Sequence, residues 1–297
     1  MTPPAPILVT GGSGQVGGAL ASLATRRGYA ITAPERGAFD LLDPVLMHAF
    51  VEGGEWTAIV NCAAYTAVDR AESEADIARA INADAPALLA HLAAERNIPF
   101  VHVSTDYVFD GSKDAPYTET DTIAPLGVYG ATKAAGEAAI RQAAPHSHAI
   151  IRTAWILSAD GANFLNTMLR FAAERDVLRV VADQVGCPTG AADLAEILLA
   201  IVERGAATGR TWHAVNDGAT SWHGLAAHIF ARAADAGLKT PRLEAIATSE
   251  YPTPARRPAN SRLATTRLQR DLNLTLRPWQ EAVDAILDER LNIRETR

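Results

Sequence analysis

The sequence has very little cysteine, since Cys62 and Cys187 are the only two in 297 residues. Two cysteines cannot form a disulfide framework, and their spacing does not match a structural zinc site. Basic residues are also in the minority, with 27 Lys and Arg against 34 Asp and Glu and a formal charge of −7. The chain therefore lacks the basic surface typical of nucleic-acid-binding proteins, and we expect no nucleic-acid partner.

Long hydrophobic runs are absent as well. No apolar segment approaches the roughly 18 residues needed to span a membrane, so we expect no membrane partner. Residues 1–6 lack the basic region that opens a secretory signal. We therefore expect a cytoplasmic protein with reduced thiols.

The sequence does contain a regular alternation of short apolar segments and helical patterns. Segments rich in Val and Ile predict strands at 7–10, 29–33, 58–62, 100–104 and 149–152. Helical patterns between them lie at 15–27, 44–51, 86–96 and 129–143. Alternation of this kind predicts right-handed βαβ units, and near-continuous apolar strands indicate a sheet covered on both faces. We predict an α/β fold, a doubly wound, Rossmann-like parallel sheet with a smaller C-terminal substrate lobe.

The expected lobes divide the chain unevenly. Residues 1–152 are predicted to form the dinucleotide-binding domain, and residues 176–202, with a strand at 179–181 and a helix at 192–202, are expected to return to it. Residues 153–175 and 203–297 are assigned to the substrate-binding lobe. Its later elements are predicted at 212–215 (strand), 222–236 (helix), 251–261 (Pro- and Arg-rich loop), 265–272 (helix) and 278–291 (helix).

A glycine-rich loop follows the first predicted strand, with Gly11, Gly14 and Gly17 spaced as G-x-x-G-x-x-G. Gly11 can take a tight turn, Gly14 lets the backbone approach a pyrophosphate, and Gly17 lets the next helix pack closely. The start of that helix offers free N–H groups and a positive dipole end to phosphate. Such glycines can also form a turn that binds nothing, but the strand–turn–helix context favours a dinucleotide site that Gln15 and Val16 complete.

This glycine spacing resembles the short-chain dehydrogenase/reductase superfamily, which implies a Tyr-x-x-x-Lys pair after the fourth strand. The pair is present as Tyr129 and Lys133, on one face of a predicted helix. Carbonyl reduction needs a proton donor at the oxygen, and a nearby ammonium lowers the pKa of a phenol by favouring the phenolate. An arbitrary pair with this spacing is usually structural, but the order of the elements favours a catalytic role here.

Two adjacent hydroxyl residues, Ser104 and Thr105, end the fourth predicted strand. Ligands of doubly wound sheets bind beyond the carboxyl ends of the strands, so a hydroxyl there can donate to a substrate carbonyl. We assign this role to Thr105, because the superfamily uses the second hydroxyl of such a pair and successive strand residues face opposite ways. Ser104 is the alternative.

Longer motifs narrow the resemblance to the dTDP-4-dehydrorhamnose reductase family. S-T-D-Y-V-F-D-G begins at Ser104, D-Q-V-G-C-P-T begins at Asp183, and Y-P-T-P-A-R-R-P begins at Tyr251. Further matching segments lie at 10–17, 61–69, 71–72, 125–133 and 152–155, so the resemblance covers nearly the full length. Dehydratases of this fold carry an Asp-Glu pair after the fourth strand. This chain lacks that Glu, which indicates carbonyl reduction without elimination.

The resemblance implies a nucleotide-sugar substrate, dTDP-4-dehydro-β-L-rhamnose, whose C4 keto group is reduced to give dTDP-L-rhamnose. Tyr129 would donate the proton, and Lys133 would lower the pKa of Tyr129 and hold the nicotinamide ribose. Thr105 and Asp106 would contact the sugar.

Two further substrate contacts follow from the same resemblance. Trp155 is expected to pack on the sugar face, with ordinary core packing as the alternative. Arg257, beside Arg256, is expected to meet the diphosphate, because guanidinium groups suit phosphate oxygens. A solvated loop is the alternative for this pair.

The end of the second strand decides between the two nicotinamide cofactors. An acidic residue there binds the ribose of NAD, whereas a nearby Arg accommodates the 2′-phosphate of NADP. By the resemblance, the family's acidic position falls at Pro34, with Glu35 and Arg36 next, so we expect NADPH, with NADH as the alternative. The cofactor contacts expected after the second and third strands are Arg36, Asp40, Leu41, Ala63, Ala64 and Tyr65.

The resemblance also implies a magnesium ion held by carboxylates at a dimer interface. One expected carboxylate position, just after the glycine loop, is Ala19, which cannot bind a cation. We therefore expect no metal site and a monomer rather than a metal-bridged dimer.

Two other functions fit the same motifs. One is a non-catalytic, NADP-binding regulatory subunit that keeps the fold, although the intact set of Thr105, Tyr129 and Lys133 argues against it. The other is a reductase or epimerase of another nucleotide-linked 4-keto-6-deoxyhexose, since these motifs determine neither the stereochemistry at C4 nor the nucleobase.

Overall fold

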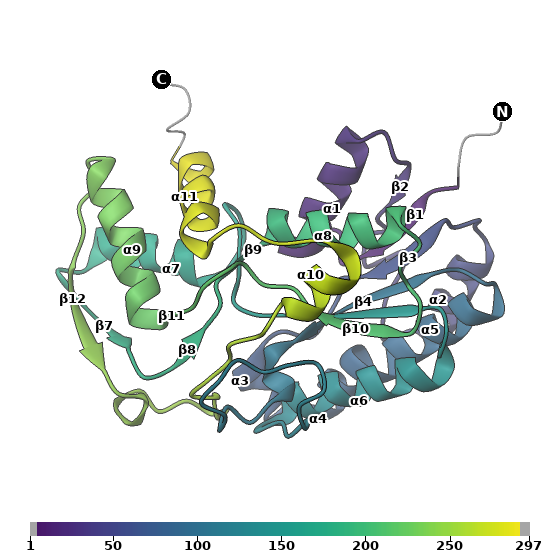
Figure 1. The fold of residues 1–297 in the computed structure, drawn as a ribbon, viewed down its shortest axis with the longest axis horizontal. Coiled ribbons are helices and arrows are strands. Elements are labelled where there is room, and N and C mark those ends of the chain that lie inside the picture. Colours follow the sequence, from purple (N-terminus) through teal and green to yellow (C-terminus); the bar gives the residue numbers. More distant parts are fainter. Residues whose placement is uncertain (1–4, 292–297) are drawn as a thin grey trace.

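The structure, a computed structural model that describes residues 5–291, contains a six-stranded parallel sheet with the order β10-β5-β4-β3-β1-β2 (Figure 1). Residues 1–4 and 292–297, which the expected lobes include, lie outside this range. The five strands expected in the first half are all present in the sheet. The strands of the sheet are β1 (Ile7–Thr10), β2 (Ile31–Thr32), β3 (Ala58–Asn61), β4 (Phe100–Thr105), β5 (His148–Thr153) and β10 (Arg210–His213).

Both faces of this sheet are covered by helices, as its apolar strands require. Along β1, Ile7 and Val9 pack on one side against α1 and α8, whereas Leu8 packs on the other against α2 and α5. Successive strand residues face opposite ways, so one apolar strand contributes to two cores. The helices of the two layers are α1 (Gln15–Arg26), α2 (Pro44–Glu52), α5 (Ala85–Glu95), α6 (Val128–Ala143) and α8 (Ala191–Glu203).

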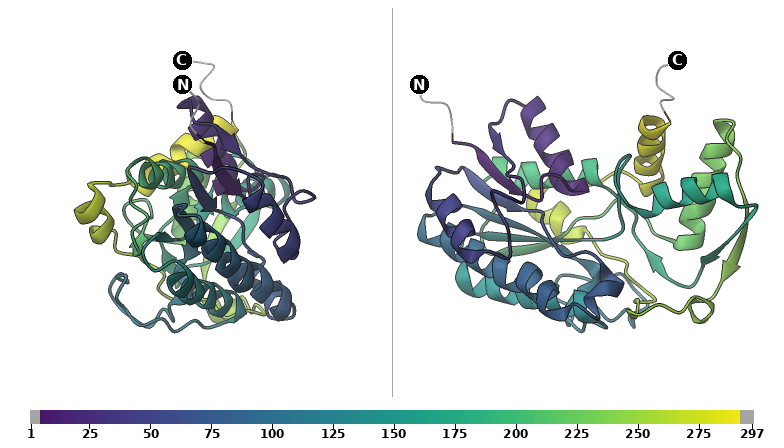
Figure 2. Two further views of the ribbon diagram at one scale, coloured as in Figure 1. Left: turned by 90° about the vertical axis from the view of Figure 1, so that its right-hand side faces the viewer. Right: turned by 180° about the vertical axis from the view of Figure 1, so that it is seen from behind.

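A second group of elements has its own core and lies beside the sheet (Figures 1 and 2). Its helices α7 (Phe164–Glu174), α9 (Trp222–Asp235) and α11 (Trp279–Arg290) pack around the parallel pair β7 (Val177–Val181) and β12 (Arg242–Ile246). None of the helices within residues 5–291 is long and apolar enough to cross a membrane.

Two expected strands belong to a different sheet from the one predicted. The strand expected at 179–181 does not return to the main sheet, because β7 pairs with β12. The strand expected at 212–215 within the smaller lobe is instead β10, which pairs with β5 in the main sheet. A short apolar run indicates a strand but not its partner. The helix expected at 192–202 does return, since α8 packs on α1 and the sheet.

Several short elements were not expected from the sequence. A π-helical turn, Ala80–Asp84, joins α4 to α5, and 3₁₀ turns occur at Asp106–Val108 and Thr248–Glu250. The other unexpected elements are α3 (Val68–Ala71), α4 (Ala75–Arg79), β6 (Ile156–Leu157), β8 (Val185–Gly186), β9 (Thr189–Gly190) and β11 (Thr220–Ser221). The helix expected at 265–272 is present as α10 (Thr266–Leu272).

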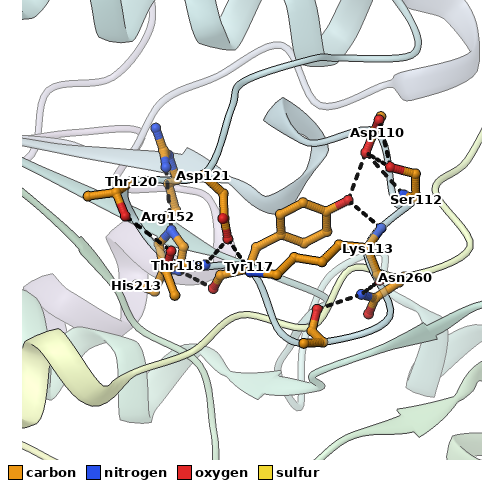
Figure 3. Close-up of polar contacts among 11 residues, drawn as sticks. Asp110, Ser112, Lys113, Tyr117, Thr118, Thr120, Asp121, Arg152, His213 and Asn260 are labelled. Carbon is orange, nitrogen blue, oxygen red and sulfur yellow. Dashed lines mark hydrogen bonds and ion pairs between the residues drawn. The ribbon is translucent and has the colours of Figure 1, made fainter.

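The loop after β4 is tied to the C-terminal part of the chain by side-chain hydrogen bonds (Figure 3). The Tyr117 hydroxyl donates to Asp110 at 2.7 Å, and the Lys113 ammonium donates to Asp121 at 2.6 Å. The Asn260 amide donates to the Ala115 carbonyl at 3.0 Å. The first two bonds hold the loop together, and the Asn260 bond joins it to a segment 145 residues further along the chain.

Candidate functional site

A cavity of about 780 Å³ lies along the carboxyl ends of the central strands. Fifteen of the residues expected from the sequence line it: Gly11, Gly14, Gln15, Val16, Gly17, Arg36, Asp40, Leu41, Ala63, Ala64, Thr105, Asp106, Tyr129, Lys133 and Trp155. Two expected residues, Tyr65 and Arg257, are not among those that line this cavity in the described part of the chain.

The glycine loop forms one end of the cavity with bare backbone. Gly11 has a φ of +69°, and a Cβ added there would come within 2.8 Å of the Ala63 nitrogen. A Cβ on Gly17 would come within 2.2 Å of the Gly11 oxygen. Helix α1 follows with Gly14 as its N-cap and no side-chain cap, so its first N–H groups are free. This geometry suits a diphosphate.

Arg36 lies at the same end, on the loop after β2. Its side chain is 74% exposed, and its Nε lies 3.5 Å from the Asp40 carboxylate. An exposed pair of this kind contributes little to stability, so the guanidinium is free to turn toward an anion in the cavity.

Tyr129 and Thr105 lie together near the middle of the cavity. Desolvation raises the pKa of Tyr129 to about 12, a hydrogen bond with the Thr105 side chain opposes this rise, and the Asp106 charge adds to it. The phenol is therefore protonated at neutral pH, as a proton donor must be.

Lys133, one helical turn further along α6, is 1% exposed. Its Nζ donates to the Val103 carbonyl at 2.7 Å and lies 3.0 Å from His102 Nε2. Burial lowers the pKa of Lys133 to about 8. The ammonium is engaged with β4, and burial is the main influence on the pKa of Tyr129 here. The role of Lys133 in lowering the pKa of Tyr129 stays a prediction.

The structure separates the two candidate hydroxyls of β4. Ser104 Oγ donates to Glu137 at 2.6 Å, and Glu137 in turn forms a buried ion pair with Arg152, with Nη2 and Oε2 2.7 Å apart. Thr105 Oγ1 donates to Asp106 at 2.8 Å and adjoins Tyr129. Both hydroxyls line the cavity and both donate within the protein. Only Thr105 adjoins Tyr129, which favours Thr105 as the hydroxyl that acts beside the phenol.

Two buried oxygens at the cavity have no hydrogen-bond partner among residues 5–291: Asp106 Oδ2 and Thr153 Oγ1. Burial raises the pKa of Asp106 to about 6. Leaving buried polar atoms unpaired is costly, and such atoms in a cavity mark sites where a ligand can complete the hydrogen bonding. Thr153 lies in the matching segment at 152–155, but the sequence pattern assigned it no role.

Trp155 stands where the second group of elements meets the cavity. Its φ is +47°, a strained value for a tryptophan. Its ring stacks flat on Trp222, with centroids 3.4 Å apart, and a Cβ on Gly186 would come within 2.5 Å of it. The aromatic pair forms one wall of the cavity, and the sequence gave no sign that Trp222 would take part.

The two expected residues outside the cavity are held by other partners. Arg257 forms two hydrogen bonds with Asp69, at 2.8 and 3.1 Å, and so anchors its loop to α3. The Tyr65 hydroxyl donates to Glu74 at 2.5 Å. Their expected contacts with the diphosphate and the cofactor stay predictions, and each would need the side chain to leave its present partner.

Asn82, in the π-helical turn, is a positioning residue that the sequence did not reveal. Its amide accepts from the Tyr65 nitrogen at 2.8 Å and donates to the Tyr65 carbonyl at 3.1 Å and to Thr132 at 3.2 Å. A Cβ on Gly136 would come within 2.1 Å of the Asn82 carbonyl, so α6 approaches this turn closely. Irregular helical turns of this type often occur at functional sites.

Ala19, where the resemblance implies a carboxylate, lies in α1. It packs against the apolar core of α1 and the sheet. Within residues 5–291 no group of three or more His, Cys, Asp or Glu side chains is placed to hold a metal ion. A metal site shared between two subunits would need ligands from both, so the absence of the metal stays a prediction.

Comparison with known proteins gives a consistent picture. The family model described as RmlD substrate binding domain matches residues 5–292. A dTDP-4-dehydrorhamnose reductase of Burkholderia thailandensis is 43% identical over 288 residues, covering 93% of this chain and 96% of the relative.

Two solved structures are also similar along nearly the whole chain. A dTDP-4-dehydrorhamnose reductase from Clostridium acetobutylicum superimposes with a TM-score of 0.91 at 34% identity, covering 96% of this chain and 99% of the other. A dTDP-4-dehydrorhamnose reductase from Bacillus anthracis, solved in complex with NADP, has a TM-score of 0.90 at 32% identity, with the same coverage.

Proposed function

Because the chain belongs to the dTDP-4-dehydrorhamnose reductase family, we propose that it reduces the C4 keto group of dTDP-4-dehydro-β-L-rhamnose with NADPH to give dTDP-L-rhamnose. The observation that carries the proposal is a single cavity that contains both the glycine loop and the set of Thr105, Tyr129 and Lys133. A reductase needs this proximity, since the reacting groups must be held within bonding range.

The glycine loop and Arg36 fit the cofactor. Side chains at Gly11 or Gly17 would collide with the backbone, and the free N–H groups at the start of α1 suit the diphosphate. Arg36 would bind the 2′-phosphate, and Ala63 and Ala64 would line the adenosine side. When bound, NADPH supplies the hydride that reduces the sugar carbonyl.

The protein supplies the proton and orients the substrate. Tyr129, kept protonated by its surroundings, donates its phenolic proton to the oxygen at C4, and the Thr105 hydroxyl donates a hydrogen bond to the same oxygen. Asp106 and Thr153 bind sugar hydroxyls through their unpaired oxygens. Trp155 packs on the sugar face, and Lys133 holds the nicotinamide ribose.

The direct test is an assay of NADPH oxidation with enzymatically prepared dTDP-4-dehydro-L-rhamnose. We expect turnover, with dTDP-L-rhamnose as the product identified by chromatography. Tight NADPH binding without turnover would contradict the proposal and support a regulatory subunit. Turnover only with another nucleotide-linked 4-keto sugar would support a different reductase of the same class.

Replacing Arg36 with alanine should raise the KM for NADPH by about 10–150-fold, because a charge-assisted contact of about 1.5–3 kcal/mol is lost. The KM for NADH should hardly change, since NADH has no 2′-phosphate. Steady-state kinetics with both cofactors measure the effect. Equal increases for NADPH and NADH would show that Arg36 has a structural role.

We also propose that the enzyme works as a monomer without a metal, in the cytoplasm, where its two free cysteines stay reduced. Activity should survive EDTA, because Ala19 removes an oxygen ligand that a hard cation requires. Light scattering at micromolar concentration, with and without EDTA, measures the mass. A dimer that dissociates on chelation would refute this expectation.

A further inference from the structure

Three polar side chains form a row across the middle of the main sheet. Thr10 of β1 is in register with Asn61 of β3, and Asn61 is in register with His102 of β4. All three are 1% exposed or less, among apolar neighbours such as Val60 and Val101. Buried polar groups in such a place are costly unless they are paired, so the partners of this row are informative.

The row is a continuous hydrogen-bonded chain that ends at Lys133. Thr10 Oγ1 donates to Asn61 Oδ1 at 2.6 Å, and Asn61 Nδ2 lies 3.0 Å from His102 Nδ1. The other ring nitrogen, His102 Nε2, lies 3.0 Å from Lys133 Nζ. Thr10 and Lys133 both line the cavity, so both ends of the chain reach the site.

The number of available hydrogens restricts which nitrogen of His102 can carry a proton in this hydrogen-bonded row. A neutral imidazole has one N–H donor and one acceptor nitrogen. When Lys133 is charged, Nε2 must accept from it, and the ring then donates from Nδ1 to the side-chain oxygen of Asn61. When Lys133 is neutral, the ring donates from Nε2, and Asn61 Nδ2 donates to Nδ1. The orientation described above, with Nδ2 toward His102, matches the neutral state. The charged state has the Asn61 amide turned, so that Oδ1 accepts from His102 and Nδ2 donates to Thr10 Oγ1, and an amide can take either orientation.

We propose that His102 is a positioning residue for Lys133, accepting one of its three N–H bonds so that the charged ammonium directs another N–H into the cavity. Val103 accepts the remaining one through its carbonyl oxygen. The role in turnover rests on the proposed function, whereas the effect on Lys133 does not.

The other titratable groups around Lys133 influence its pKa but do not take the place of His102 as the hydrogen-bond acceptor. Glu137, on the same helix, raises the pKa of Lys133 by its charge, and Cys62, at the end of β3, acts in the same direction. Tyr129 lies one turn before Lys133 and is neutral. Burial holds the pKa of His102 well below its usual value, so the ring stays neutral and keeps one nitrogen that can accept from the charged Lys133.

The test compares His102→Leu with His102→Gln. Leucine removes the acceptor, whereas the glutamine oxygen reaches about as far as Nε2. Loss of a hydrogen bond to a charged group should lower the pKa of Lys133 by about one to two units. The alkaline limb of kcat should move to lower pH by that amount in His102→Leu and return toward the wild-type position in His102→Gln.

A second measurement is independent of the sugar substrate: the pH dependence of the NADPH dissociation constant, followed by fluorescence. The same shift is expected, because Lys133 binds the cofactor only when charged. If the wild-type protein does not turn over the sugar, the proposed function fails, and this measurement still tests His102.

His148→Leu is the matched control. His148 is also a buried strand histidine, with Nδ1 2.6 Å from the Ala144 carbonyl, but it does not line the cavity. The His148→Leu protein should be less stable than the wild type, but its pH profiles of kcat and of the NADPH dissociation constant should not shift. A folded His102→Leu protein with wild-type profiles would overturn the proposal. So would equal shifts in the His102→Leu and His148→Leu proteins, or a folded His102→Gln protein that behaves like His102→Leu.

Discussion

Replacing Tyr129 with phenylalanine is expected to lower kcat by roughly 10²–10⁴-fold, the usual contribution of a positioned general acid. The change removes only the hydroxyl that would protonate the C4 oxygen. The ring and its edge-to-face contact with Tyr107, with centroids 5.6 Å apart, remain. NADPH affinity should therefore stay within a few-fold of the wild-type value. Stopped-flow and steady-state assays of NADPH oxidation measure both quantities.

Tyr117→Phe is the control for this experiment. Tyr117 is 3% exposed, and its hydroxyl donates to Asp110 outside the cavity (Figure 3). Its loss should cost about 1 kcal/mol of stability and leave kcat near the wild-type value. If Tyr129→Phe turned over at a near wild-type rate, another group would have to supply the proton.

Replacing Glu137 with leucine is expected to destabilise the protein by about 3–5 kcal/mol, because it leaves the Arg152 charge buried and unpaired. Glu137 and Arg152 are 0% and 1% exposed, and two hydrogen bonds of 2.7 and 2.8 Å join them. Ser104 would lose its acceptor as well. Urea unfolding measures the loss. Arg141→Ala, which removes a more exposed arm of the same cluster, should cost less than about 1 kcal/mol.

The Glu137→Leu/Arg152→Met double variant should lose less free energy of unfolding than the two single variants lose together, since no unpaired charge remains. Additive losses would contradict the ion-pair explanation.

The same ion pair makes stability depend on pH. Burial acts to raise the pKa of Glu137, but the hydrogen bonds and charge of Arg152 outweigh it and hold the pKa at about 2. An unfolded glutamate titrates near pH 4.3. The stabilisation is therefore fully present above about pH 5 and is lost as the pH falls toward 2, and this acid sensitivity should be reduced in the Glu137→Leu protein.

The sequence by itself determined the features that depend on local spacing. Alternating apolar strands and helices predicted the doubly wound sheet, and the glycine spacing predicted the turn between β1 and α1, where Gly11 has a φ of +69°. The i, i+4 spacing put Tyr129 and Lys133 on one helix face. These features can be predicted because the backbone geometry of helices and strands repeats every few residues and so determines which side chains share a face.

Only the tertiary structure decided which distant groups meet. The pattern of β7 did not reveal its pairing with β12, and a short strand carries no signal for its partner. Arg257 suits a phosphate equally well in sequence terms, but in the fold it binds Asp69. The direction of the Lys133 ammonium likewise depends on His102, placed beside it by the register of three strands. Each of these contacts depends on packing between segments that are far apart in the chain, and the local spacing of residues does not predict such packing.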